Sequence, residues 1–263
     1  MKFVGLGMAG LVLAASPALA DSPFDGTWKA KLDSMKRVAK PDTMMLKNGT
    51  FTCQTCQPKP YSVPADGQFH AVAGRPYWDE IAINAVDDHS LKLQFRKAGT
   101  IISTSTQTVS ADGRTMTTVS HNTNNGGNVP IDATGTATRV GAAVTGAHLA
   151  SGSWDVKPAT QVSDAALTMK IKVDGNKFHQ EVGLGESLDA TIGGAYALNQ
   201  GDPGKTMTKV ERLGPRSLRM TDMRGGKVVN VATYTVAADG TTINGSYRDP
   251  QTGETGTMVA MKM

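Results

Sequence analysis

Apolar and polar side chains alternate along short stretches of this chain. Every second residue is apolar over 167–173, and the same alternation occurs over 28–32 and 91–95. A period of two is typical of a β-strand that buries one face. Several of these stretches are followed by Asn-Gly or Asp-Gly, which favour tight hairpin turns. No stretch shows convincing helical periodicity, so the sequence predicts an all-β protein.

The same pattern is present twice. The segment FDGTWK around Trp28 returns as ASGSWD around Trp154, which lies 126 residues later. The Asp-Gly pair that ends at Gly113 returns at Gly240, 127 residues later. Internal similarity at a fixed spacing indicates a duplicated structural unit. We expect roughly eight or nine short strands in each copy, as in a meandering sandwich or barrel.

The repeat defines the expected domain organisation. Copy one covers residues 21–140, a short linker of small residues covers 141–149, and copy two covers 150–263. Each copy has the usual size of a domain that folds independently. Asn48-Gly49 and Asp174-Gly175 are expected to form matching hairpin turns. The residues interpreted as structural are Trp28, Trp154, Gly49, Gly113, Gly175 and Gly240.

The Gly-x-Trp at Trp28 resembles the opening strand of the lipocalin and fatty-acid-binding-protein superfamily. The wider set of shared residues is similar to uncharacterised exported bacterial domains of lipocalin-like type. This resemblance implies two tandem small antiparallel barrels or strongly curved meander sheets, in which each tryptophan closes one end of its own barrel. It also implies a late-strand arginine over the tryptophan, for which Arg139 is the candidate in copy one, whereas copy two ends in Lys262-Met263. The resemblance implies no known activity.

The amino terminus has the composition of a secretory signal peptide. Lys2 is followed by an apolar run over residues 3–15 and by the small-x-small sequence Ala18-Leu19-Ala20. We expect residues 1–20 to be removed before Asp21, and the mature chain to be periplasmic or secreted. No later stretch approaches the roughly 20 apolar residues that a membrane-spanning helix needs. We therefore expect no integral membrane association.

The charge of the chain does not indicate a nucleic-acid partner. The 27 Lys and Arg residues and 23 Asp and Glu residues give a net charge of +4, and the basic residues are scattered along the chain. Nucleic-acid-binding proteins instead gather basic residues on one face. The sequence also contains no Gly-x-Ser-x-Gly, His-Glu-x-x-His or Walker motif, which lowers the expectation of an enzyme.

Cys53 and Cys56 occur only in copy one, and three interpretations are open. A local disulfide suits an oxidising compartment, and it is the interpretation we favour. A catalytic redox pair needs a helix N-terminus or cationic neighbours, and Pro58 and Pro60 argue against a helix there. A zinc or copper site needs more ligands than two thiolates, with His70 as the only local addition. We expect no metal and no cofactor.

Aromatic residues beside a histidine also distinguish copy one. His70, Tyr77, Trp78 and Phe95 are our candidate ligand-binding residues, because aromatic side chains and a histidine together can form the mouth of a pocket. Such residues also cap barrels or fill contacts between domains.

Three functions remain open at the level of sequence. The leading hypothesis is a non-enzymatic exported protein that binds a small apolar molecule, because an eight-stranded barrel can enclose one ligand or its own side chains. The alternative is an envelope structural or interaction protein with filled barrels. The second alternative is a metal or redox protein that uses the two cysteines.

Overall fold

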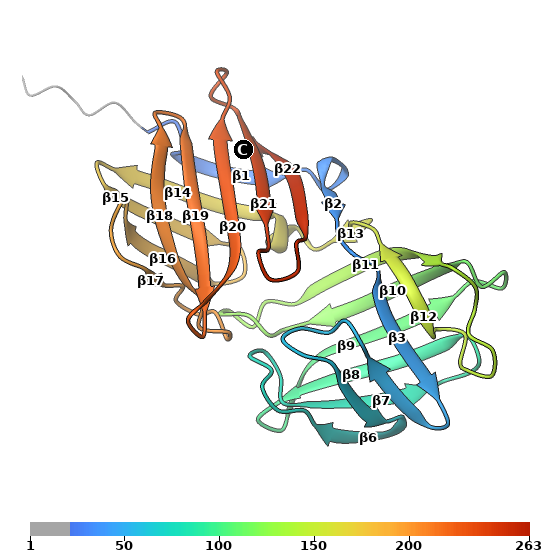
Figure 1. The fold of residues 1–263 in the computed structure, drawn as a ribbon. Coiled ribbons are helices and arrows are strands. Elements are labelled where there is room, and N and C mark those ends of the chain that lie inside the picture. Colours follow the sequence, from blue (N-terminus) through green and yellow to red (C-terminus); the bar gives the residue numbers. More distant parts are fainter. Residues whose placement is uncertain (1–21) are drawn as a thin grey trace, which may run out of the picture.

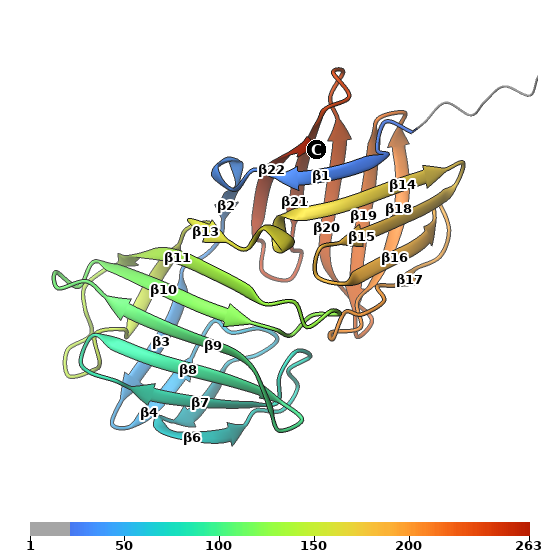
Figure 2. The same ribbon diagram turned by 180° about the vertical axis from the view of Figure 1, so that it is seen from behind.

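The computed structural model describes residues 22–263, and it consists of two antiparallel β-sheets that each curl into a nearly closed barrel (Figures 1 and 2). The expected signal peptide, residues 1–20, lies outside the described residues. Over residues 22–263 there is no α-helix, and the two helical segments are the short 3-10 turns η1 (Leu32–Ser34) and η2 (Asp164–Leu167). The described chain has no helix that is long and apolar enough to cross a membrane. The predicted all-β fold with two tandem barrels is confirmed.

The first barrel consists mostly of copy one. Its strands follow the order β5-β4-β3-β12-β11-β10-β9-β8-β7-β6, and β13 adds to β11. The strands are β3 (Asp42–Lys47), β4 (Thr50–Cys53), β5 (Tyr61–Pro64), β6 (Asp66–Ala71), β7 (Glu80–Ala85), β8 (Ser90–Lys97), β9 (Thr100–Val109), β10 (Thr115–Asn122), β11 (Ile131–Val140), β12 (Gly152–Val156) and β13 (Gln161–Val162).

The second barrel repeats this plan. Its order is β16-β15-β14-β1-β22-β21-β20-β19-β18-β17, with β2 added to β22. An isolated bridge between Ser187 and Gln200, two residues beyond the last strand of this order, links the two ends of the sheet. The strands are β1 (Gly26–Ala30), β2 (Lys36–Val38), β14 (Thr168–Asp174), β15 (Lys177–Val182), β16 (Glu186–Thr191), β17 (Ala197–Leu198), β18 (Met207–Gly214), β19 (Ser217–Arg224), β20 (Lys227–Val236), β21 (Thr242–Arg248) and β22 (Thr255–Lys262).

The two barrels exchange their tryptophan strands. β1, which opens copy one, lies between β14 and β22 of the second barrel, and β12, which opens copy two, lies between β3 and β11 of the first. In Figure 1 the blue β1 accordingly lies with the yellow, orange and red strands. The sequence copies 21–140 and 150–263 therefore describe the repeat, whereas each barrel takes two strands from the other copy, the tryptophan strand and the short strand β13 or β2. The expectation that each tryptophan closes its own barrel is wrong in this respect.

Each exchanged tryptophan is fully buried and covered by a cation. The indole nitrogens of Trp28 and Trp154 donate to the carbonyl oxygens of Phe24 and Ala150, both at 2.8 Å. The guanidinium of Arg139 lies 4.1 Å from the ring centre of Trp154, and it thus covers the tryptophan of copy two rather than Trp28. Lys262 takes the corresponding place, with its Nζ 5.5 Å from the ring centre of Trp28.

The hairpin turns set the register of the strands. Asn48 and Gly49 form the expected turn between β3 and β4, both with positive φ. In copy two β14 continues through Asp174, so the turn is Gly175-Asn176 and not the expected Asp174-Gly175. A shift of one residue would turn every side chain of the strand to the opposite face. The observed register keeps the buried residues of β14 inside the barrel, and this burial outweighs the preference for Asp-Gly.

Each barrel has its own hydrophobic core. The core of the first barrel surrounds Trp154 and includes Phe51, Ile81 and Leu91, while that of the second surrounds Trp28 and includes Phe178 and Leu218. Because each core contains a tryptophan from the other copy, the exchange of strands is also an exchange of core residues.

Candidate functional site

The register assigns equivalent interior positions to the two barrels. In the first barrel, Gln107 lies opposite Leu91 on one side and Thr118 on the other. Tyr234 has the same place in the second barrel, opposite Leu218 and Gly245. A glutamine in one barrel thus corresponds to a larger aromatic side chain in the other.

At a second interior position, the first barrel again has the smaller side chain. Gly135 lies opposite Thr118, and its counterpart opposite Gly245 is Met258. A Cβ atom added at Gly135 would meet no atom within 4 Å, whereas one added at Gly245 would lie 2.9 Å from Met258 Cγ and 3.3 Å from Tyr234 Cε1. Large side chains therefore fill the second barrel at positions where the first barrel is open.

The first barrel contains a cavity in two connected parts. The part beside Tyr61, called the outer part, has a volume of about 700 Å³ and is lined partly by the second barrel, and the part beside Trp154, called the inner part, has about 340 Å³. Asp42, Met44 and Gln107 line both parts. The corresponding space in the second barrel, beside Tyr234, is about 160 Å³. Binding pockets for small molecules usually measure roughly 300–1,000 Å³, so both parts of this cavity fall in that range and the space beside Tyr234 does not.

Three aromatic rings form the wall of the outer cavity. Tyr61 and Trp78 meet edge to face with their ring centres 5.7 Å apart, and Trp78 meets Phe95 in the same way at 5.2 Å. All three rings are half-buried and face the cavity. Burial raises the pKa of Tyr61 to about 12, so its hydroxyl stays neutral at physiological pH. The structure thus brings together Trp78 and Phe95 of the sequence-predicted set and adds Tyr61.

Arg75 braces the mouth of this cavity. Its guanidinium lies over the rings of Tyr61 and Trp78, with Cζ 4.8 and 5.5 Å from the two ring centres. Its terminal nitrogens donate to the carbonyl oxygens of Gln57 and Lys59, in the loop between β4 and β5. Burial lowers the pKa of Arg75, and the residue is only 6% exposed. Arg75 therefore fixes the segment before β7, which carries Trp78, against the loop that follows the two cysteines.

The second barrel closes the cavity from outside. Arg37 from β2 and the turn between β21 and β22 form the outer rim of the cavity. Glu254 in that turn accepts hydrogen bonds from Arg37 Nη2 at 2.9 Å and from the Tyr247 hydroxyl at 2.8 Å. The rim is therefore held by a hydrogen-bonded cluster that belongs to the neighbouring barrel.

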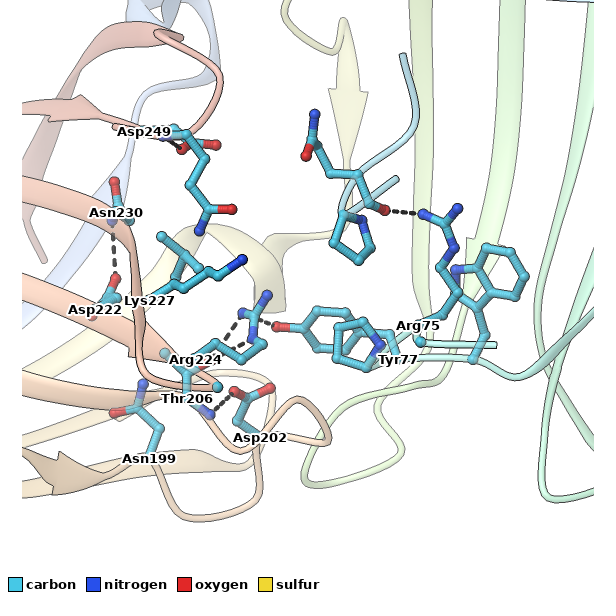
Figure 3. A pocket seen from close by; sticks show the side chains of 18 of the residues that line it. Arg75, Tyr77, Asn199, Asp202, Thr206, Asp222, Arg224, Lys227, Asn230 and Asp249 are labelled. Carbon is cyan, nitrogen blue, oxygen red and sulfur yellow. Dashed lines mark hydrogen bonds between the residues drawn. The ribbon is translucent and has the colours of Figure 1, made fainter. Parts of the chain in front are cut away.

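Tyr77 does not face the barrel cavity but lies in a cleft of about 840 Å³ between the barrels (Figure 3). Its hydroxyl accepts a hydrogen bond of 2.5 Å from Arg224 Nη2, and the Arg224 guanidinium lies 4.7 Å from its ring centre. A Cβ atom added at Gly204 would lie 2.7 Å from the Tyr77 ring. Burial raises the pKa of Tyr77. These contacts make Tyr77 a point of attachment between the two barrels.

His70 lies apart from the other predicted site residues. It is on β6, where its Nε2 contacts the Asp66 carboxylate at 2.9 Å. It lines neither the barrel cavity nor the cleft between the barrels.

Cys53 and Cys56 form a disulfide at the rim of the outer cavity, as we favoured from the sequence. Within residues 22–263 no group of three or more His, Cys, Asp or Glu side chains is arranged to hold a metal ion.

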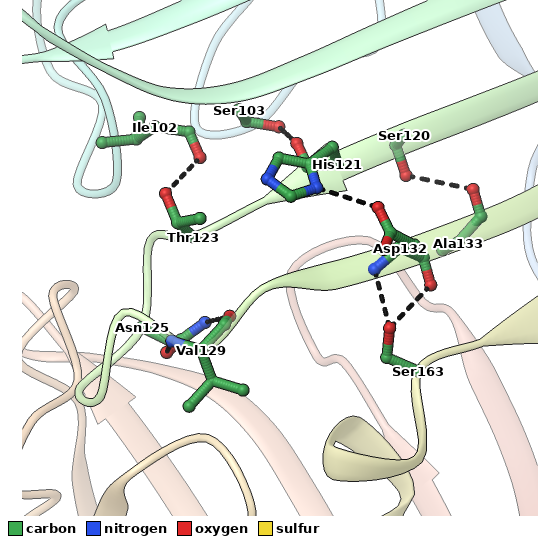
Figure 4. Close-up of polar contacts among 10 residues, drawn as sticks. All are labelled: Ile102, Ser103, Ser120, His121, Thr123, Asn125, Val129, Asp132, Ala133 and Ser163. Carbon is green, nitrogen blue, oxygen red and sulfur yellow. Dashed lines mark hydrogen bonds and ion pairs between the residues drawn. The ribbon is translucent and has the colours of Figure 1, made fainter.

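A serine, a histidine and an aspartate meet on the outer face of the first barrel (Figure 4). His121 Nδ1 contacts the Asp132 carboxylate at 2.8 Å. The Ser163 hydroxyl is instead bonded to the backbone of Asp132, accepting from its N–H at 2.9 Å. A nucleophilic triad needs the serine hydroxyl beside the histidine ring, so this cluster does not have the geometry of one.

The sequence did not single out Asp42, Tyr61, Arg75 or Gln107. The detectable signal was the contrast between the copies, since Tyr234 is one repeat length from Gln107. No family model matches this chain, and no curated protein has a significantly similar sequence.

Proposed function

We propose that this protein is an exported, non-enzymatic binding protein that holds one small, mostly apolar molecule in its first barrel. The observation that carries the proposal is the aromatic-lined cavity of about 700 Å³ beside Tyr61, Trp78 and Phe95. Known small-molecule sites combine apolar walls with polar groups that orient the ligand, and this cavity has charged and amide side chains beside its aromatic wall, among them Asp42 and Gln107.

The second barrel has a supporting role in this proposal. Tyr234 and Met258 occupy its interior, and it supplies the rim around Glu254 that covers the cavity of its neighbour. One filled barrel beside one open barrel explains why the aromatic trio is found in only one copy.

The proposal is tested by filling the cavity with the side chains of the other barrel. The probe is phenylnaphthylamine, a neutral apolar compound whose fluorescence rises in an apolar site. We expect it to bind the full-length mature chain, and we expect Gln107→Tyr and Gly135→Met to weaken binding at least about tenfold, because they remove cavity volume. Tyr234→Phe, a nearly isosteric change in the second barrel, is the matched control and should leave the affinity unchanged.

Native mass spectrometry of the purified chain provides an independent readout. A bound small molecule that is lost from Gln107→Tyr supports the proposal. Equal binding of the probe by the wild type and both filled variants would contradict it, as would the absence of any binding to the wild type.

A further inference from the structure

We propose that the molecule held by the first barrel is an apolar amine, whose ammonium group is bound by the carboxylate of Asp42. This inference rests on the function proposed above and specifies the chemistry of its ligand. It is based on the polar side chains that line the cavity.

Asp42 lines both parts of the cavity and lies on a strand that pairs with the exchanged strand β12. It is the first residue of β3 and lies opposite Trp154 of β12, at the junction of the outer and inner parts. Among residues 22–263, no side chain or backbone group forms a hydrogen bond or ion pair with its carboxylate. A half-buried carboxylate without a partner is costly, and a cation that binds it recovers that free energy.

The side chain of Gln107 is the second unsatisfied group. Its Oε1 is buried and has no hydrogen-bond partner in the described part of the chain. Gln107 lines the same two parts of the cavity as Asp42. Buried amides are normally hydrogen-bonded, and a turn of this side chain toward the cavity would bring the oxygen to a donor on a bound molecule. An ammonium group offers three donors, which is enough for the carboxylate and for this oxygen.

The neighbouring charged groups do not pair with the Asp42 carboxylate, so it is available to a ligand. Arg37 and Glu254 are the charged groups that act on it, and they are bonded to each other at 2.9 Å. Burial raises the pKa of Asp42, Arg37 opposes this rise and Glu254 adds to it. Lys40 is exposed at the mouth, and Lys157, beside the inner part, is paired with Asp155. The ionised carboxylate is thus stabilised less than it would be in water.

Arg75 does not make this cavity a binding site for an acid instead of an amine. Its terminal nitrogens are bonded to the carbonyl oxygens of Gln57 and Lys59, and its face is occupied by the rings of Tyr61 and Trp78. Its Nε is buried without a hydrogen-bond partner, but the two terminal nitrogens that would pair with a carboxylate are already bonded to the protein.

The aromatic walls favour the same ligand. Trp78 and Phe95 are adjacent in the wall, and aromatic faces attract ammonium groups as well as apolar bodies. The second barrel provides an internal comparison, because Met169 lies opposite Trp28 at the position of Asp42. At this position, the carboxylate is thus found in the barrel with the larger cavity and a thioether in the other.

Isothermal titration of the full-length mature chain with three probes tests the inference. Naphthylmethylamine, naphthylmethanol and naphthylacetate share one apolar body and differ in their polar group. We expect the amine to bind about tenfold more tightly than the alcohol, as one charge-assisted hydrogen bond allows, and the acetate to bind most weakly. Asp42→Asn should bring the amine to the affinity of the alcohol. Asp132→Asn removes the same charge from the outer face, and it should change nothing.

The outcomes separate the two proposals. An acetate that binds as tightly as the amine, or an unchanged amine affinity in Asp42→Asn, would overturn the amine while leaving the cavity function in place. No binding of any of the three probes would overturn both. The comparison of probes on the wild-type chain decides the question even if Asp42→Asn fails to fold.

Discussion

The guanidinium of Arg139 lies over the ring of Trp154, although the two residues belong to different sequence copies. Arg139 also donates to the carbonyl oxygens of Gly113, Ser151 and Leu149. Arg139→Ala leaves these carbonyls and the ring without their partner, so we expect a loss of about 3 kcal/mol in the free energy of unfolding. Urea denaturation measures this change. Arg139→Lys should recover only part of the loss, because lysine lacks the planar fork.

Lys262 is the matched control for this prediction. It covers Trp28 in the second barrel with an exposed ammonium group. An exposed cation–π contact contributes roughly 0.5–1 kcal/mol, so Lys262→Ala should cost no more than that. Equal costs for the two alanine variants would contradict the anchoring role assigned to Arg139.

Gly135 in the first barrel and Gly245 in the second predict opposite responses to alanine. A Cβ atom added at Gly135 would meet no atom within 4 Å. Gly135→Ala should therefore be neutral, or stabilise the chain by about 0.5 kcal/mol because alanine lowers the backbone entropy of the unfolded chain. Gly245→Ala places a Cβ 2.9 Å from Met258 Cγ and should destabilise the chain by about 1–3 kcal/mol. Thermal or urea unfolding of both variants checks the contrast. A destabilised Gly135→Ala would show that the first barrel is filled.

The exchange of strands predicts that the halves stay together after the chain is cut. Ala142 and Ala143 are exposed in the connection after β11, where a protease site can be introduced. The cleaved fragments should elute as one species in gel filtration, because each donates a buried tryptophan strand to the barrel of the other. Denaturant should be required to separate them. Fragments that separate in buffer alone would refute the exchange.

His179 predicts a small dependence of stability on pH. Its ring contacts the carboxylates of Asp189 at 2.7 Å and Glu181 at 3.1 Å, and hydrogen bonding to Asp189 and then Glu181 raises its pKa above 6.5. The contribution of His179 to the free energy of unfolding is fully present below the pKa of the unfolded state, near 6.5. It is lost as the pH rises through the higher pKa of the folded state. Proton NMR titration should give a raised pKa for His179, which falls back in Asp189→Asn. The side chain is 36% exposed, so solvent screens these contacts and the effect on stability is small.

The sequence predicted the strand content and the duplication because alternation and turns are local signals. It placed the turn at Asn48-Gly49 correctly, and it missed Gly175-Asn176 by one residue because burial along β14 decides that register. It could not predict the exchange of β1 and β12. The two tryptophan strands are similar in sequence, and either would present an indole to either barrel.

The cavity was partly visible from the sequence. Trp78 and Phe95 were found because aromatic residues distinguish copy one. Asp42 and Gln107 were missed because a polar residue on a strand does not show which face it occupies until the register is known. Tyr77 was a candidate for its aromatic ring alone, and only the three-dimensional position of Arg224 identifies it as a contact between barrels.

The connectivity of this chain matches that of a strand-swapped homodimer whose two subunits have been fused end to end. In a dimer, each barrel would be completed only by binding a strand of a second molecule, so assembly would depend on protein concentration. Here the covalent tether holds each donor strand at a high effective concentration, so completion of both barrels becomes independent of protein concentration. The fusion also frees the two halves from symmetry, so that one could become hollow while the other stayed solid.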